Sequence, residues 1–241
     1  MPDRLAYRLR QCANRLLHPL GLHLTRASRA FEMDDLLRGV AQRGPRPATF
    51  LDVGASDGVW SRRARAHFPD ATFVLFEPLA EHQAALNRFA REPRIHVVPA
   101  VATDREGTIN FTVSPDLDGS GVTESGGRPV PATTIDATVT RLGLAPPFAL
   151  KLDTHGHELA VLAGASETLP RTDLLIIEAY NFELHPGSPR FPALCAWLET
   201  RGFRCIDLAD PLRRPSDGVL WQMDLAFAPA NRPLFQSNRY R

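Results

Sequence analysis

The stretch FLDVGASDGVWS, residues 50–61, reads as a buried strand that ends at Asp52, followed by a glycine turn and the start of a helix. Gly54 and Gly58 would let the backbone come close to a ligand, as it does in dinucleotide-binding folds. Ser56 stands where the nicotinamide pattern G-x-G-x-x-G has its second glycine. The turn therefore favours a ligand without a diphosphate, although a purely structural turn fits two glycines about as well.

Apolar runs alternate with helical patterns from Ala48 onward, which is typical of a parallel sheet covered by helices on both faces. The runs are almost continuously hydrophobic, so we expect the strands to be buried on both sides. The predicted strands are residues 48–53, 72–77, 95–100, 148–153, 174–179, 203–208 and 224–228, and the predicted helices between them are residues 60–66, 81–90, 158–165 and 191–201. The segment 108–114 and the Gly/Ser-rich segment 114–130 interrupt the alternation, and we interpret the latter as a mobile loop near an opening.

The first residues differ in character from the rest. Leucines at near-helical spacing, with arginines between them, predict a basic amphipathic helix within residues 1–26, and a second helical run covers residues 31–44. Packing of the apolar stripe on the following domain is the commoner arrangement, while an anionic membrane surface or a partner chain is the alternative. We therefore predict an N-terminal helical appendage, 1–47, and one α/β domain, 48–241.

An acidic residue ends the second predicted strand. Glu77 follows the glycine turn by about twenty positions, where a carboxylate can accept hydrogen bonds from both hydroxyls of a ribose. Taken alone, Glu77 could equally be a solvated strand end. Together, the turn and Glu77 predict a nucleoside-type cofactor.

Titratable groups gather at the end of a later strand, in the stretch KLDTHGHE, residues 151–158. Asp153 and Lys151 share one face of that strand. Asp153 could orient a hydroxyl or take its proton, and the imidazole of His155 is a second candidate base because histidine titrates near neutral pH. The alternative is that Asp153 and Thr154 only cap the helix that begins near His157.

A metal site built from Asp153, His155 and His157 is considered because carboxylate and imidazole are common ligands. We expect no metal there, since His157 should lie in the helix and point elsewhere. After the next strand, three polar residues are candidate substrate contacts, with a structural loop as the alternative: Glu178, Asn181 and His185.

Composition excludes several classes of protein. The chain has 241 residues and a formal net charge of +1, so it lacks the basic excess of a nucleic-acid-binding protein. Three scattered cysteines argue against a disulfide framework or a thiolate zinc site, and no apolar run is long enough to span a bilayer. A cytoplasmic protein fits best. Lys151 is the only lysine, which suggests a place where a compact ammonium is needed.

Several motifs, taken in order, resemble the FkbM family of S-adenosylmethionine-dependent methyltransferases. They are FLDVGASDGVWS, LFEP, VVPAVATDREGTINF, VPATTIDATV, KLDTHGHELAVLAGA and DGVLWQMDLAF, and they extend over most of residues 49–227. The resemblance implies a class I methyltransferase fold, Rossmann-like, with a seven-stranded sheet whose last strand is antiparallel. It also implies transfer of a methyl group to a hydroxyl on a glycan or natural product.

The resemblance implies a role for particular residues. The residues implied at the cofactor, S-adenosyl-L-methionine, are Asp52, Gly54, Ala55, Asp57, Gly58, Glu77, Pro78, Ala100 and Val101. Lys151, Asp153, Gly156 and Glu158 match the family's Lys-x-Asp-x-Glu-Gly-x-Glu signature, whereas His155 stands where an acidic or amide residue is usual. This departure leaves the catalytic base open between Asp153 and His155, with Lys151 keeping Asp153 ionised.

Two other functions compete with this prediction. The chain could be an inactive cofactor-binding scaffold or sensor, or a nicotinamide oxidoreductase, which Ser56 disfavours. We expect a small-molecule or glycan acceptor and no nucleic acid, and the N-terminal helix could support either a homodimer or peripheral membrane contact.

Overall fold

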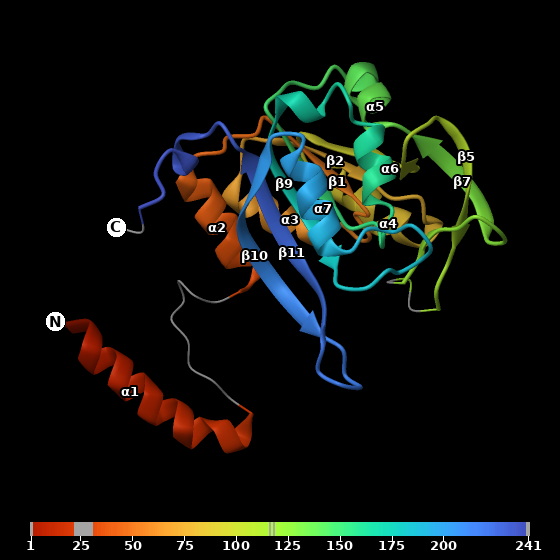
Figure 1. Cartoon of the computed structure of the whole chain (residues 1–241). Helices are drawn as coiled ribbons and strands as arrows, with labels where there is room; N and C mark the ends of the chain where they lie inside the picture. Colours follow the sequence, from red (N-terminus) through yellow and green to blue (C-terminus); the bar gives the residue numbers. More distant parts are fainter. Residues whose placement is uncertain (1, 22–30, 116, 118, 240–241) are drawn as a thin grey trace.

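A seven-stranded sheet forms the centre of the computed structural model, which describes residues 2–21, 31–115, 117, 119–239 (Figure 1). The strand order is β10-β11-β9-β8-β1-β2-β3. Strands β2, β3, β8 and β9 run parallel to their neighbours around β1, whereas β11 lies antiparallel between β9 and β10. The mostly parallel sheet with an antiparallel last strand confirms the fold class expected from the resemblance.

All seven predicted strands of this sheet are present. They are β1 (Thr49–Val53), β2 (Thr72–Phe76), β3 (Ile95–Val98), β8 (Phe148–Leu152), β9 (Thr172–Tyr180), β10 (Phe203–Arg213) and β11 (Leu220–Pro229). Every residue of β1 and β8 is buried, as their continuous hydrophobicity predicted. β9, β10 and β11 are longer than predicted, because both polar and apolar residues continue these strands beyond the predicted runs.

Helices cover both faces of the sheet (Figure 1). One face carries α2 (Met33–Arg43), α3 (Val59–His67) and α4 (Ala80–Phe89), whose apolar residues share a core with Phe50, Phe73 and Leu75. The other carries α5 (Ile135–Leu142), α6 (Glu158–Ala163) and α7 (Phe191–Glu199), packed on Leu51, Leu150 and Leu175. α5 was not predicted from the sequence. Short 3-10 turns lie at His18–Leu20, Leu169–Arg171 and Pro233–Phe235.

The N-terminal helix α1 (Pro2–Leu17) lies apart from the sheet (Figure 1). Leu9, Leu16 and Leu20 are exposed, so the expectation that this stripe packs on the following domain is wrong for these three residues. α2, in contrast, contributes buried Leu36 and Leu37 to the core of the sheet. The division between residues 1–47 and 48–241 stays a prediction. Within the described residues, no helix has both the length and the hydrophobicity needed to cross a bilayer.

A second, four-stranded sheet stands where the sequence analysis expected an interruption. Its strands are β4 (Val101–Ala102), β5 (Gly107–Thr112), β6 (Gly121–Val122) and β7 (Arg128–Thr133), in the order β4-β7-β5-β6. The interpretation of residues 114–130 as a loop is therefore wrong in part, because β6 and the start of β7 lie inside this segment. The two glycines at 126 and 127 have positive φ and turn the chain between β6 and β7.

Candidate functional site

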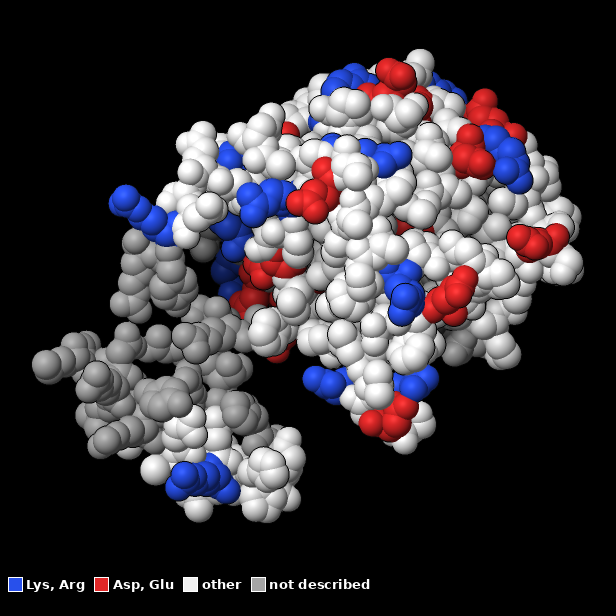
Figure 2. Space-filling view, in the orientation of Figure 1, with Lys and Arg blue, Asp and Glu red and all other residues white. Residues whose placement is uncertain are grey.

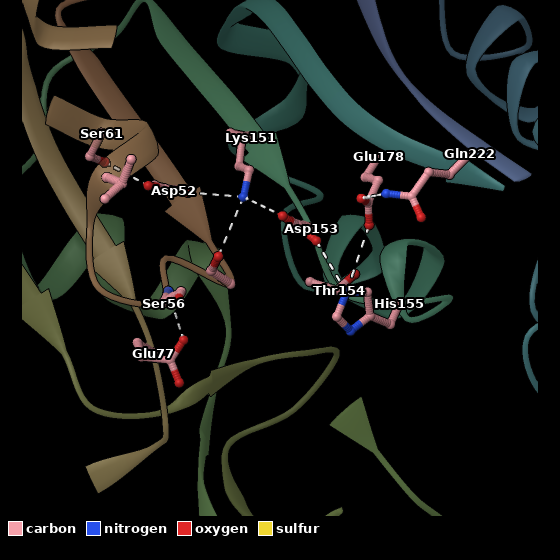
Figure 3. Close-up of polar contacts among 12 residues, drawn as sticks. Asp52, Ser56, Ser61, Glu77, Lys151, Asp153, Thr154, His155, Glu178 and Gln222 are labelled. Carbon is pink, nitrogen blue, oxygen red and sulfur yellow. Dashed lines mark hydrogen bonds and ion pairs between the residues drawn. The ribbon is translucent and has the colours of Figure 1, made fainter. Parts of the chain in front are cut away.

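A cavity of about 760 Å³ opens at the carboxyl ends of β1, β2, β8 and β9. Open α/β sheets bind ligands at this edge, next to the strand where the chain order reverses. Ser120, which precedes β6, and Val122 of β6 also line the cavity. The volume falls in the range of roughly 300–1,000 Å³ found for small-molecule sites. Figure 3 shows the polar side chains at this edge.

Gly54 lies directly after β1 and lines the cavity. Its φ of 75° favours glycine, and an ideal Cβ at this position would overlap the backbone oxygen of Asp153. The absence of a side chain is thus required both by the turn and by the close approach of the segment after β8. This confirms the tight glycine turn predicted from the sequence.

The Glu77 carboxylate is fixed at the end of β2. Its Oε2 accepts a hydrogen bond from the backbone N–H of Ser56 at 2.9 Å, and its Oε1 accepts one from the N–H of Leu79 at 2.8 Å (Figure 3). Burial raises the pKa of Glu77 above its usual value, although both backbone donors oppose the change. The solvated strand end considered from the sequence is wrong, because Glu77 is only 5% exposed. A further lone pair on each oxygen remains for donors from a ligand.

Asp52 lies behind the cavity rather than in its lining. It is fully buried, accepts a hydrogen bond from Ser61 Oγ at 2.6 Å, and its Oδ1 lies 3.6 Å from Lys151 Nζ (Figure 3). Burial raises the pKa of Asp52, while the charge of Lys151 acts in the opposite direction. In this position, the carboxylate of Asp52 forms an ion pair with the ammonium group of Lys151.

The other residues predicted at the cofactor divide into two groups. Pro78, Ala100 and Val101 line the cavity with Gly54 and Glu77. Three residues do not line it: Ala55 is buried in the core on the α2–α4 side, Asp57 accepts a hydrogen bond from the N–H of Val59 at the start of α3, and Gly58 packs near Leu75, Leu86 and Phe89. For the first group, contact with the cofactor stays a prediction, and the position of these residues in the cavity lining favours it.

Lys151 and Asp153 form an ion pair at the end of β8. Nζ of Lys151 lies 3.0 Å from Asp153 Oδ2 and donates to the carbonyl oxygen of Gly54 at 3.3 Å. Burial opposes the ionisation of Asp153, but the charge of Lys151 and the hydrogen bonds that Asp153 accepts together outweigh it, so the pKa of Asp153 lies below its usual value. Burial also opposes the charge on Lys151, yet Asp153 and Asp52 together raise its pKa. The predicted arrangement, with both side chains on one face, is confirmed.

His155 lies beside Asp153 in the turn between β8 and α6. Its Nδ1 lies 2.9 Å from the carbonyl oxygen of Ser120, and its Nε2 faces Asp153 Oδ1 at 3.4 Å and Glu178 Oε2 at 3.7 Å (Figure 3). The φ of His155 is 52°, a conformation that non-glycine residues adopt mainly where the surroundings enforce it. The imidazole therefore contacts Ser120 on one side and the carboxyl groups of Asp153 and Glu178 on the other.

Asp153 does not cap the following helix. The N-cap of α6 is His157, without a side-chain cap bond, and Thr154 Oγ1 instead donates to Glu158 Oε1 at 3.0 Å. His157 Nε2 lies 2.9 Å from Thr103 Oγ1, so its ring is engaged there. The capping alternative for Asp153 is wrong.

Glu178, predicted as a substrate contact, lies within this cluster. Tyr180 donates a hydrogen bond to its Oε2 and Gln222 donates one to its Oε1. Burial, together with the charge of Asp153, raises the pKa of Glu178 to about 9. The other two residues predicted to contact substrate lie elsewhere: Asn181 Nδ2 donates to the carbonyl oxygen of Leu220 at 3.1 Å, and His185 borders a neighbouring hollow with His157.

The sequence analysis missed several residues of the cavity. Ser120 comes from the Gly/Ser-rich segment, and Tyr180, Trp221 and Gln222 come from the ends of β9 and β11. Tyr180 and Gln222 are register partners in neighbouring strands. The alternation of Glu178 and Tyr180 along one strand face could have indicated Tyr180, whereas Gln222 depends on strand pairing that one sequence does not reveal.

Residues 52–205, more than half of the chain, match the family described as the methyltransferase FkbM domain. The chain belongs to the FkbM methyltransferase family. The matched range contains every charged residue of the site except those contributed by β11, so the family assignment and the cavity rest on the same segment.

A curated relative of this FkbM protein is the 2-O-methyltransferase NoeI of Sinorhizobium fredii (strain NBRC 101917 / NGR234). The two sequences are 30% identical over 159 residues, which make up 57% of this chain and 65% of NoeI. The chain thus spans slightly less than two thirds of the length of that relative.

Solved structures with a similar fold show low identity. Methyltransferase FkbM from Methylobacillus flagellatus KT has a TM-score of 0.48 and 17% identity, covering 76% of this chain and 44% of that one. A putative O-methyltransferase from Klebsiella pneumoniae has a TM-score of 0.47 and 13% identity, covering 91% and 89%. A putative tRNA (m1A22) methyltransferase from Streptococcus pneumoniae, in complex with S-adenosyl-L-methionine, has a TM-score of 0.47 and 15% identity, covering 82% and 73%.

Proposed function

We propose that this FkbM protein transfers a methyl group from S-adenosyl-L-methionine to a hydroxyl oxygen of a glycan or natural-product acceptor. One observation carries the proposal: a single cavity is lined both by Glu77, a carboxylate suited to a ribose, and by Asp153 and His155, which are suited to a hydroxyl. Family membership supports methyl transfer, and the name of NoeI, a 2-O-methyltransferase, supports an oxygen acceptor.

The residues present fit the cofactor. At Gly54 no side chain covers the backbone, so the cofactor can approach it closely. The backbone N–H groups of Ser56 and Leu79 hold the Glu77 carboxylate in one orientation. Glu77 would accept the ribose hydroxyls, and Ala100 and Val101 would contact the adenine. When bound, the cofactor supplies an electrophilic methyl group on a sulfonium sulfur.

The protein's part of the chemistry is alignment and proton removal. Asp153, kept ionised by Lys151, or His155, which faces it at 3.4 Å, would position the acceptor hydroxyl and accept its proton. Lys151 acts through Asp153 and is not itself in the cavity lining. Glu178 borders the same part of the cavity and would contact the acceptor.

We infer the class of acceptor from the cavity lining and the surface charge. Ser120, Gly121 of β6 and Trp221 of β11 line the cavity on the side of the acceptor groups. On the face shown in Figure 2, basic and acidic side chains are interspersed. We propose a small-molecule or glycan acceptor on this basis. Cytoplasmic location, the absence of a nucleic-acid partner and a homodimer stay predictions.

A transfer assay tests the proposal. The full-length protein would be incubated with methyl-labelled S-adenosyl-L-methionine and a panel of saccharides and hydroxylated natural products. Label should appear on an acceptor oxygen with the wild type, and Asp153→Asn should abolish it. Binding of S-adenosylhomocysteine without transfer to any acceptor would favour the inactive scaffold, and no binding at all would overturn the proposal.

A further inference from the structure

Three side chains of the cavity each place one potential metal-ligating atom close to the other two. They are Asp153, His155 and Glu178, and the three ligand atoms lie within 4.8 Å of one another. They come from two neighbouring strand ends, β8 and β9, so the sheet itself holds the group together. All three residues line the cavity.

The imidazole presents a lone pair to the two carboxylates. His155 Nδ1 lies 2.9 Å from the carbonyl oxygen of Ser120, and because a carbonyl only accepts, Nδ1 carries the hydrogen. Nε2 of the neutral ring is therefore an acceptor, yet it faces two carboxylate oxygens. These three atoms can therefore all serve as ligands to a cation placed between them. Metal-binding histidines commonly donate their second N–H to a backbone carbonyl in this way.

Donors outside the cluster hold both carboxylates in place. Lys151 holds Oδ2 of Asp153 at 3.0 Å, and Gln222 donates to Oε1 of Glu178. Oδ1 of Asp153 and Oε2 of Glu178 consequently point toward His155, although Tyr180 also donates to Oε2. Such second partners fix the orientation of ligand side chains in metal sites.

The distances between the three ligand atoms fit a bound cation. Nε2 of His155 lies 3.4 Å from Asp153 Oδ1 and 3.7 Å from Glu178 Oε2. A charge-assisted hydrogen bond from an imidazolium would be shorter, about 2.7–2.9 Å. Neighbouring ligand atoms around a cation with bonds of about 2.1 Å lie roughly 3 Å or more apart, which is closer to the observed spacing.

We propose that Asp153 Oδ1, His155 Nε2 and Glu178 Oε2 bind a divalent cation of the Mn²⁺ class, with its open coordination positions facing the cavity. The mixture of two carboxylates and one imidazole suits a transition-series cation, since carboxylates alone would suit Mg²⁺ or Ca²⁺. Binding of the cation does not depend on the proposed function. Its role does: Asp153 and His155 would hold the cation, and the cation would position an oxygen of the acceptor in the cavity.

The sequence analysis expected no metal because it considered His157 as the third ligand. His157 is turned toward Thr103, but Glu178 of the neighbouring strand supplies a third ligand atom instead. The cluster was hidden from the sequence because Glu178 is separated from Asp153 by a helix and a strand.

Mn²⁺ binding to the full-length protein tests the proposal. Chelator-treated protein, without cofactor or acceptor, would be titrated with Mn²⁺ while free Mn²⁺ is measured by electron paramagnetic resonance. We expect one bound ion for each wild-type chain. His155→Ala and Glu178→Gln should each weaken binding at least about 10-fold. The matched control is Glu183→Gln, which changes an exposed acid in the loop after β9 and should leave the affinity unchanged.

Each outcome decides the proposal. No Mn²⁺ bound by the wild type up to about 1 mM, or an equal loss in Glu183→Gln, would overturn it. If Glu178→Gln does not fold, His155→Ala carries the test, since that side chain is 28% exposed and its removal leaves the core intact. Titration of the same samples with S-adenosylhomocysteine separates the two proposals. Cofactor binding without Mn²⁺ binding would overturn only the metal site, and Mn²⁺ binding without cofactor binding would overturn only the proposed function.

Discussion

Lys151 Nζ lies between two carboxylates of the site, 3.0 Å from Asp153 Oδ2 and 3.6 Å from Asp52 Oδ1. Its side chain is 4% exposed and Asp52 is fully buried, so solvent screens these charges very little. The only lysine of the chain thus links the strand that carries the glycine turn, β1, to the strand that carries the proposed base, β8.

Removing this lysine should destabilise the protein. Lys151→Met leaves Asp52 and Asp153 without their cation, and breaking a buried pair costs about 3–5 kcal/mol in free energy of unfolding. Urea unfolding at pH 7 measures the change. Adding Asp52→Asn to Lys151→Met should recover part of the loss, because one uncompensated carboxylate is then gone. A loss below about 1 kcal/mol would show that this ion pair behaves like an exposed one.

Gly54→Ala should be far more harmful than a change at a comparable glycine. Gly54 and Gly202 have similar φ values, 75° and 79°, but an added Cβ meets the backbone of Asp153 at Gly54 and nothing within 4 Å at Gly202. Gly202→Ala should therefore cost about 1–2 kcal/mol from backbone strain alone. Gly54→Ala should cost about 1–3 kcal/mol more from overpacking and should also lose cofactor binding. Equal thermal stabilities for the two variants would contradict the close approach of β1 and β8.

Cofactor affinity should fall as the pH decreases. Burial raises the pKa of Glu77 above its usual 4.5, and the ribose hydroxyls require the ionised form as acceptor. Lowering the pH through the raised pKa protonates Glu77 and weakens binding, while binding at constant pH in this range releases a proton. Calorimetry with S-adenosylhomocysteine between pH 8 and 5 measures this dependence. Glu77→Gln has no group to titrate there, and an identical pH dependence in wild type and Glu77→Gln would refute the assignment.

Asp153 and His155 should affect turnover more than cofactor binding. At saturating cofactor, Asp153→Asn and His155→Ala should each lower kcat by about 10²–10⁴-fold, because the acceptor loses its positioning or its proton acceptor. The affinity for S-adenosylhomocysteine should stay within about threefold, since Glu77 and Gly54 hold that ligand. Normal kcat in both variants would mean that another group serves the acceptor.

The central sheet could be predicted because its strands are buried on both faces and therefore read as continuous apolar runs. The second sheet could not, since its strands are only two to six residues long and β5 exposes most of its residues. Polar sequence and glycines there indicate a loop unless the pairing of β5 with β7 is known.

The sequence predicts those parts of the site that come from the end of a single strand. Lys151, Asp153 and His155 lie within five residues, and Glu77 ends a neighbouring strand, so their presence at one edge follows from the topology of a parallel sheet. The contact of His155 with Ser120, and those of Glu178 with Gln222, join segments 35 and 44 positions apart. Such contacts depend on strand register, which hydrophobic periodicity does not define across a whole sheet.

Binding of S-adenosylhomocysteine to the wild type and to Glu77→Ala, measured side by side by isothermal titration calorimetry, tests the central claim most directly. The account predicts one binding site in the wild type and a loss of about 1.5–3 kcal/mol in binding free energy for Glu77→Ala, as expected when a charged hydrogen-bond acceptor is removed. Absence of binding by the folded wild type, or equal affinity in Glu77→Ala, would contradict the assignment of this cavity to the cofactor.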